Sequence, residues 1–385
     1  MCEYIKKKKI GIVTLIGYDN YGNRLQNYAI QETVKTLGYN AETLVITDIL
    51  NKITFINKLR KRISNLGNIS FLGIYKRLKR ELQRLKRKLH FYLHRELLRN
   101  RQYIFLNFVN NYINEVNMNA KDLTVAINNY DFFITGSDQV WNPFFNGFSS
   151  IYFLEFAPKE KRIAYAPSFG IPKIPAVYKE KYKKWIMEIP YLSVREESGA
   201  KIIKELTGKD VPVLIDPTLM LTKEKWLSIA KNDPGKPNSP YLIAYFLGRV
   251  PKETRTRIEK IARENELKIV RLTDLKDKKR YLVGPNEFID YINSATLICT
   301  DSFHGTVFSI LFEKPFVVFD RVGTSMYSRL DTLLNKFNFH SREANNLSDN
   351  EIFKIDFSHV SSILEEERNQ AFEFLNKALK VSENK

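Results

Sequence analysis

Residues 296–321, TLICTDSFHGTVFSILFEKPFVVFDR, contain the pattern that decides the fold. The apolar run 297–300 predicts a buried strand, 301–305 a polar turn, 306–313 a short apolar helix and 316–319 a second buried strand. This order predicts a parallel βαβ unit. Anions collect where the first strand of such a unit ends, because the next helix begins there with unpaired N–H groups and the positive end of its dipole.

The turn of this unit carries a histidine among small polar residues. His304 lies at the expected anion site, Ser302 and Thr306 place hydroxyls beside it, and Gly305 permits close approach of a ligand to the backbone. A lone histidine in such a turn is often only a helix cap. The combination favours function, with His304 as a catalytic residue and Ser302, Gly305 and Thr306 as substrate-binding residues.

Length and composition indicate a globular protein with two domains. The chain has 385 residues, 44% of them hydrophobic, which is enough for a sizeable core. Its two cysteines, Cys2 and Cys299, have no metal-ligand spacing around them, so we expect no metal site and a reducing compartment. The apolar run near the N-terminus is short and broken by Gly17, so it reads as a first strand rather than a signal peptide. We expect a cytoplasmic protein.

The net charge of +18 is concentrated in one segment. Residues 58–101 contain fifteen Lys or Arg against Glu81 and Glu96. Leucines recur there with helical spacing, at Leu78, Leu82, Leu85, Leu89, Leu93 and Leu97. A basic amphipathic helix of this kind suits an anionic membrane surface, where each charge contributes about 1 kcal/mol. Nucleic acid and a merely solvated face are the alternatives. The segment lacks a base-stacking platform or DNA-binding motif, so we expect membrane contact and no nucleic acid.

The N-terminal part opens as a doubly wound α/β domain. Strand 10–17, loop 18–23, helix 24–37 and strand 41–46 follow one another. The loop, in GYDNYGNRLQNYA, lacks the G-x-G-x-x-G spacing of dinucleotide-binding proteins. Asn23 and Gln26 at the helix start either bind an acceptor hydroxyl or phosphate, or cap the helix.

Further polar residues follow predicted strands of this domain. In YDFFITGSDQVWNP, residues 130–143, the strand breaks at Gly136, Ser137 and Asp138. A carboxylate there is placed for catalysis or for hydroxyl binding, although aspartates in such loops often form only an Asx turn. In the same way, strand 162–165 runs into APSFG, which carries Ser168.

Arg195 ends the strand in YLSVREESG. A guanidinium at a strand end can hold a carboxylate or phosphate with two hydrogen bonds. The alternative is an ordinary salt bridge to Glu196 or Glu197.

The segment KNDPGKPNSP, residues 231–240, has the composition of a linker. It divides the chain into an N-terminal α/β domain, residues 1–230, and a C-terminal α/β domain, residues 241–385, in which strands and helices again alternate. The tail 358–380 predicts an amphipathic helix that packs back on the first domain.

Six motifs in this order give the sequence a family resemblance: GNRLQNYA, ITGSDQVWNP, YAPSFG, SVREESG, DPTLML and TDSFHGTVFSILFEKPF. Over nearly its whole length the chain resembles the polysaccharide pyruvyl transferases. The resemblance implies two Rossmann-like domains facing across a cleft, as in GT-B glycosyltransferases, with the acceptor on the first domain and the donor on the second. It also implies transfer of the enolpyruvyl unit of phosphoenolpyruvate to a sugar hydroxyl pair, which forms a pyruvate ketal. Phosphoenolpyruvate is then a co-substrate, and no other cofactor is expected.

The chemistry of this transfer suggests roles for the candidate residues. His304 serves as the acid or as a phosphate ligand, Arg195 matches the family's donor-binding arginine, and Asp138 orients or deprotonates the acceptor hydroxyl. Better-studied members of that family have an Arg-Leu-His sequence at the turn where this chain has Ser302, Phe303 and His304. Arg249, Lys314 and Arg321 are candidates to replace the missing guanidinium.

Three functions follow from these observations. The first is pyruvyl transfer to a lipid-linked oligosaccharide precursor of a capsule, exopolysaccharide or cell-wall polymer, with the basic segment resting on the inner membrane face. The second is nucleotide-sugar-dependent glycosyl transfer on the same architecture. The third is a membrane-binding or nucleic-acid-binding module whose catalytic site has decayed.

Overall fold

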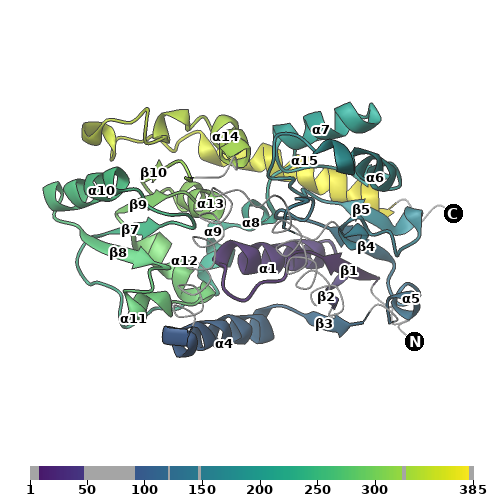
Figure 1. Cartoon of the computed structure of the whole chain (residues 1–385), viewed down its shortest axis with the longest axis horizontal. Helices are drawn as coiled ribbons and strands as arrows, with labels where there is room; N and C mark the ends of the chain where they lie inside the picture. The colour runs from purple at the N-terminus through teal and green to yellow at the C-terminus, as the bar shows by residue number, and fades with distance from the viewer. Residues whose placement is uncertain (1–7, 47–91, 120–121, 146–148, 323–326, 381–385) are drawn as a thin grey trace, which may run out of the picture.

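The computed structural model describes residues 8–46, 92–119, 122–145, 149–322 and 327–380 (Figure 1). In these residues the N-terminal part forms a six-stranded sheet in the order β3-β2-β1-β4-β5-β6, and every strand pairing is parallel. The strands are β1 (Lys9–Val13), β2 (Asn40–Ile46), β3 (Glu115–Met118), β4 (Phe132–Thr135), β5 (Arg162–Ala164) and β6 (Tyr191–Leu192). A sheet in which the chain winds outward in both directions from β1 is the doubly wound arrangement.

The helices that accompany this sheet are α1 (Tyr21–Thr36), α4 (Arg95–Tyr112), α5 (Asp122–Ala126), α6 (Ala176–Met187), α7 (Glu197–Thr207), α8 (Pro217–Met220) and α9 (Lys223–Leu227). Short 3-10 turns occupy Ser150–Phe153 and Lys159–Lys161. Helix α1 begins three residues earlier than the sequence predicts. Its cap is Asn20, whose side chain accepts a hydrogen bond from the Asn23 N–H.

The second sheet has the order β10-β9-β7-β8 and is also parallel. Its strands are β7 (Tyr241–Tyr245), β8 (Lys268–Leu272), β9 (Leu297–Thr300) and β10 (Phe316–Val318). The helices are α10 (Lys252–Glu264), α11 (Lys278–Tyr281), α12 (Pro285–Ser294), α13 (Phe303–Leu311), α14 (Tyr327–Lys336) and α15 (Val360–Lys380), with 3-10 turns at His340–Arg342 and Asp349–Glu351. The predicted fold class, α/β with two parallel sheets, is confirmed.

The predicted turn at 301–305 is shorter in the structure. Helix α13 starts at Phe303, so His304 belongs to its first turn. Ser302 is the cap, because its hydroxyl accepts the Gly305 N–H at 3.3 Å. Gly305 lies so close to β9 that an added Cβ would come within 2.6 Å of the Thr300 hydroxyl.

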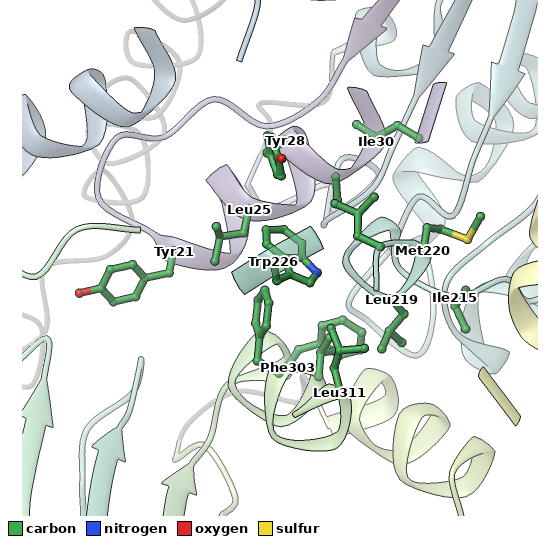
Figure 2. Close-up of a cluster of buried hydrophobic side chains, with 14 of the residues drawn as sticks. Tyr21, Leu25, Tyr28, Ile30, Ile215, Leu219, Met220, Trp226, Phe303 and Leu311 are labelled. Atoms are coloured by element: carbon green, nitrogen blue, oxygen red, sulfur yellow. The ribbon is translucent and has the colours of Figure 1, made fainter. Parts of the chain in front are cut away.

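Aromatic packing joins the two sheets around α1. Figure 2 shows Trp226 between α1 and the start of α13, surrounded by Leu25, Tyr28 and Phe303. The Trp226 ring lies 5.5 Å from the ring of Tyr28 and 5.0 Å from that of Phe308, measured between centroids. Side chains from both sheets therefore share one hydrophobic core.

Tyr21, the first residue of α1, reaches into the second half of the chain. Its ring stacks on Phe288 at 4.3 Å and meets Tyr245 at 5.7 Å. Its hydroxyl donates to the carbonyl of Val283 at 2.7 Å. This contact fixes the start of α1 against the second sheet.

The last helix crosses back to the first half. In Figure 1, α15 (yellow) runs along the molecule from α14 toward α6. Arg368 donates to the carbonyls of Leu219 and Leu221, which belong to α8 and its cap, at 2.7 and 2.9 Å. The Phe374 ring lies 6.4 Å from that of Tyr165, which follows β5.

Most of the basic amphipathic helix predicted near 78–97 lies outside the described residues. The described remainder begins with the exposed side chains of Tyr92 and Leu93 and continues into α4. In the described part of the chain, no helix combines the length and the apolar character needed to cross a membrane.

Candidate active site

The candidate active site is built around a buried carboxylate, Asp216. It accepts a hydrogen bond from Arg195 Nη1 at 2.5 Å through Oδ2, and the Ser137 hydroxyl lies 2.8 Å from the same oxygen. His304 Nε2 is 3.6 Å away from that oxygen. Arg195 follows β6 of the first sheet and His304 follows β9 of the second. Residues from both sheets therefore meet at one carboxylate.

Asp216 is held in place by the helix that it caps. Its Oδ1 accepts the N–H of Thr218 at 3.0 Å and the Thr218 hydroxyl at 2.7 Å. Burial alone would raise the pKa of this carboxyl, but the charges of His304 and Arg195 outweigh burial and hold the pKa well below its ordinary value. Asp216 is therefore ionised at neutral pH.

A second carboxylate, Asp138, lies beside this cluster and is more open to solvent, with 15% of its side chain exposed. Its Oδ2 accepts the Asn23 amide at 3.2 Å, and Arg195 Nη2 lies 3.7 Å from its Oδ1. Burial opposes ionisation, but Arg195, His304 and Arg329 lower the pKa of Asp138 below its ordinary value. The backbone there has φ +63°, which aspartate tolerates.

Two guanidinium groups approach the ring of Phe303. The Cζ of Arg195 is 4.4 Å from the ring centroid and that of Arg329, on α14, is 5.9 Å away. Both distances lie in the range of cation–π attraction. Burial and the nearby charge of Arg195 lower the pKa of Arg329 to about 10, so this side chain also remains charged at neutral pH.

Three donors of this cluster have no acceptor at hydrogen-bond distance among the described residues. They are Nε and Nη2 of Arg195, together with Nε2 of His304, and all three atoms are buried. The nearest carboxylates lie farther away, that of Asp138 at 3.7 Å from Arg195 Nη2 and that of Asp216 at 3.6 Å from His304 Nε2. A buried donor without an acceptor costs about 1–3 kcal/mol, more when it is charged. An anionic ligand would supply the acceptors that these groups lack.

Gly22, in the first turn of α1, lies against the imidazole of His304. A Cβ added at Gly22 would stand 2.0 Å from His304 Nδ1. Only glycine therefore lets the α1 start approach the histidine this closely.

The residues predicted at the end of β4 and the start of α1 support the cluster. Asn23 orients Asp138 as described above. The amide of Gln26 donates to the Thr14 hydroxyl at 2.9 Å and accepts the Ser137 N–H at 3.3 Å. Gly136 has φ +127°, and a Cβ there would meet the Tyr165 carbonyl oxygen at 2.0 Å. Gln26 and Gly136 thus shape the turn that carries Ser137 and Asp138.

Other residues predicted to bind substrate have partners inside the protein. Ser168 is fully buried, and its hydroxyl donates to Glu196 Oε1 at 3.0 Å. Ser302 caps α13, and the Thr306 hydroxyl donates to the Ser302 carbonyl at 3.1 Å. Together with Gly305, which packs on β9, these residues build the helix start that presents His304.

The three candidates for the missing guanidinium lie elsewhere or are paired. Arg321 binds Asp301, with its Nε 3.1 Å from Oδ2. Arg249 lines a separate cavity, and Lys314 precedes β10 with a pKa lowered by burial. The additional guanidinium at the Phe303 ring, one residue before His304, is instead that of Arg329.

The sequence was also compared with models of known protein families. The sequence model described as polysaccharide pyruvyl transferase matches residues 20–321, which include every residue of the cluster except Arg329. The chain belongs to the polysaccharide pyruvyl transferase family. The search of curated proteins finds no match.

Solved structures resemble this pyruvyl transferase family member in chain path only. One is UDP-GlcNAc 2-epimerase from Neisseria meningitidis bound to UDP-GlcNAc, with 12% identity, a TM-score of 0.47, and 97% of this chain and 98% of that chain covered. Another is the glycosyltransferase SnogD from Streptomyces nogalater, with 11% identity, a TM-score of 0.38 and coverages of 98% and 99%. At these identities the likeness does not extend to substrate.

Three residues of the site were not predicted from the sequence. Asp216 lies in DPTLML, where an aspartate before proline and threonine indicates a helix cap and nothing more. Gly22 and Arg329 carry no local signal, because each acts through contacts with distant segments. Among the described residues, no cluster of three or more His, Cys, Asp or Glu side chains is arranged to hold a metal ion.

Proposed function

We propose that this protein transfers the pyruvyl unit of phosphoenolpyruvate to two hydroxyls of a sugar in a polysaccharide precursor, forming a pyruvate ketal. Beyond family membership, the convergence of Arg195 and His304 on Asp216 is the observation that carries the proposal. Their buried donors without acceptors suit a small ligand that carries a carboxylate and a phosphate.

The donor would be held by two arginines and the histidine. Nε and Nη2 of Arg195 lie along one edge of the guanidinium, which suits hydrogen bonding to the two oxygens of a carboxylate or phosphate. Arg329, which also lies near Phe303, adds a second positive charge. Asp216 keeps Arg195 in place from the opposite side, through Nη1.

The reaction needs one proton at the donor's methylene carbon and two attacks at its C2. Protonation of the methylene makes C2 electrophilic, and a first sugar hydroxyl adds there. The C–O bond to phosphate then breaks, and a second hydroxyl closes the ketal. One hydroxyl proton is balanced by the new methyl group and the other leaves with the phosphate. His304 is positioned as the acid that delivers the proton.

Asp138 is positioned to receive the proton of the sugar hydroxyl. It is ionised, it is the more exposed carboxylate of the pair, and Asn23 fixes its orientation. Asp216 is fully buried and bonded on both oxygens, which suits a positioning role.

Release of inorganic phosphate from phosphoenolpyruvate tests the proposal. Purified protein should release phosphate only when a suitable saccharide is added. His304→Ala should lower the rate at least about a thousandfold, a loss at the scale of general acid catalysis. The matched control is His340→Ala, because that imidazole is 43% exposed and belongs to a separate turn. Full activity of His304→Ala would remove the assignment.

Thermal unfolding in the presence of each candidate donor separates the competing function. If the protein transferred sugar from a nucleotide donor, UDP-sugars or GDP-sugars would raise its melting temperature and phosphoenolpyruvate would not. We propose further that the acceptor is lipid-linked and that the protein acts at the inner membrane face. Removal of residues 58–91 should then weaken binding to anionic liposomes and leave phosphate release in solution measurable.

A further inference from the structure

A large cationic cavity lies at the carboxyl ends of β7 and β8, apart from the Asp216 cluster. Its volume is about 1160 Å³. Its basic lining residues are Arg249, Lys252, Arg255, Arg271, Lys276, Lys278 and Lys279, against the acidic Glu259, Asp274 and Asp277. In Figure 1 this is the end of the molecule where α10 and α11 are labelled. The volume exceeds that of most small-ligand pockets, about 300–1,000 Å³, so the cavity has room for more than one phosphate.

Most of these cations have no anionic partner among the described residues. Arg271 pairs with Glu259 at 3.2 Å. No ion pair between described residues involves the other six basic side chains of the lining. Positive charges gathered in a concave site focus the field on an anionic ligand, whereas charges scattered over a convex surface are screened separately by solvent.

The backbone around the cavity is held in a fixed shape. Asp301 accepts the N–H of Leu247 at 2.7 Å and that of Gly248 at 2.9 Å, which pins the loop between β7 and α10. Across the cavity, Thr273 has φ +73°, which is rare for a β-branched residue, and its hydroxyl donates to the Phe246 carbonyl at 3.1 Å. Strain of this kind is concentrated at ligand sites.

The helix that borders the cavity adds to the attraction. Helix α10 starts at Lys252 with no side chain capping it, so its first N–H groups are left for solvent or a ligand. The carboxyl edge of a parallel sheet, next to a helix start, is where α/β proteins bind phosphate groups.

Contacts of Asp301 and Arg321 link the loop beside the cavity to the segment that carries His304. Asp301, which pins the loop on one side of the cavity, is three positions before His304. Arg321 packs on Gly248 from that side, where an added Cβ would lie 2.7 Å from Arg321 Cγ. The loop that lines the cavity is therefore attached to the end of β9, after which His304 follows.

We propose that this cavity binds the diphosphate group of an acceptor sugar that is carried on a diphosphate. The inference rests on the proposed function for the identity of the acceptor, although the cavity's charge and shape stand without it. A diphosphate carries more negative charge and more acceptor oxygens than a single phosphate, so it suits a lining in which seven basic residues face three acidic ones. The carrier is either a lipid or a nucleoside, because both present the same diphosphate.

Direct binding to the full-length protein tests this site without catalysis. Isothermal titration calorimetry with inorganic pyrophosphate should show binding at least tenfold tighter than with inorganic phosphate, weakening as salt is raised. The double variant Arg249→Gln with Lys252→Gln should weaken pyrophosphate binding at least tenfold. The matched control is Lys179→Gln with Lys183→Gln, which removes the same charge from the exposed surface of α6.

Two further probes identify the carrier. Tighter binding of farnesyl diphosphate than of pyrophosphate supports the site with a lipid carrier, and tighter binding of UDP supports it with a nucleoside carrier. Equal binding of all three supports a site that reads the diphosphate alone. The proposal is overturned if pyrophosphate binds no better than phosphate, or if the Arg249 and Lys252 variant binds it as the control does.

A last variant separates this inference from the proposed function. His304→Ala should abolish phosphate release and leave pyrophosphate affinity unchanged. If it instead abolished pyrophosphate binding, the diphosphate would lie in the Asp216 cluster and the cavity proposal would be wrong. If phosphoenolpyruvate proved not to be the donor while pyrophosphate still bound through Arg249 and Lys252, the proposed function would fail and the cavity would remain a diphosphate site.

Discussion

Asp216→Asn should destabilise the protein strongly and in a pH-dependent way. The substitution keeps the shape of the side chain but removes the charge that pairs with Arg195, of which only 1% of the side chain is exposed. Removing one partner of a buried ion pair costs about 3–5 kcal/mol, because the other charge is left buried and uncompensated. Since domains of ordinary stability unfold with about 5–15 kcal/mol, this loss is a large share of the total.

The pH dependence follows from the depressed pKa of Asp216 in the folded protein. Its ordinary value is 3.8, and the native value is well below that. As pH falls below about 4, the unfolded chain takes up a proton that the native carboxylate does not, so the stabilisation is present above that pH and is lost gradually as pH falls further toward the native pKa. The difference between wild type and Asp216→Asn should therefore be largest at pH 7, should shrink by about 1 kcal/mol by pH 3, and should shrink further in stronger acid.

Urea unfolding followed by tryptophan fluorescence measures both quantities. The control is Asp210→Asn, whose carboxylate pairs with Lys204 at the surface with 85% of its side chain exposed. It should change the free energy of unfolding by less than about 1 kcal/mol. Equal stability of Asp216→Asn and wild type at pH 7, or a difference that does not shrink in acid, would refute this reasoning.

Three further substitutions test the site and the core. Gly22→Ala should push His304 out of place and lower phosphate release at least about tenfold, with a stability cost of about 1–3 kcal/mol for overpacking. The control is Gly17→Ala, whose added Cβ would lie 3.5 Å from its nearest neighbour. Equal activity of the two variants would contradict the contact between Gly22 and His304. Arg329→Gln should raise KM for phosphoenolpyruvate roughly tenfold to a hundredfold, the effect of a lost charge-assisted hydrogen bond of about 1.5–3 kcal/mol. The control, Arg263→Gln on the surface, should leave KM unchanged. A normal KM in Arg329→Gln would exclude a role for Arg329 in binding phosphoenolpyruvate. Trp226→Ala should lower the free energy of unfolding by about 3–5 kcal/mol. The control, Tyr103→Ala at an exposed position, should lower it by less than about 0.5 kcal/mol. Thermal and urea unfolding measure both losses, and similar losses would show that Trp226 does not join the sheets.

Most helices and strands could be predicted from the sequence because the patterns that indicate them are local. Leu297–Thr300 is a strand as predicted, since a short apolar run between polar turns fits a buried parallel strand. The helix ends were less predictable. Helix α13 begins at Phe303 rather than Thr306, because the cap depends on where the Ser302 side chain points.

The site was only partly visible in the sequence for a related reason. His304, Arg195 and Asp138 each follow a strand, and the carboxyl ends of parallel strands are where ligands bind. Asp216 follows no long strand, and its contact with Arg195 exists only once the sheets are assembled. Ser168 and Thr306 have the same polar character as ligand-binding residues, yet their hydroxyls are used within the protein.

The exchange of elements between the two sheets limits how the protein can be divided. Tyr21 anchors its aromatic ring among residues 245–288, and Arg368 returns from the last helix to the carbonyls that follow Ile215. A cut within 231–240 would therefore give two fragments that each lack a piece of their own interior. Neither fragment would be a self-sufficient folding unit. Grafting the second half onto a relative would therefore require moving α1 with it, and grafting the first half would require moving α15.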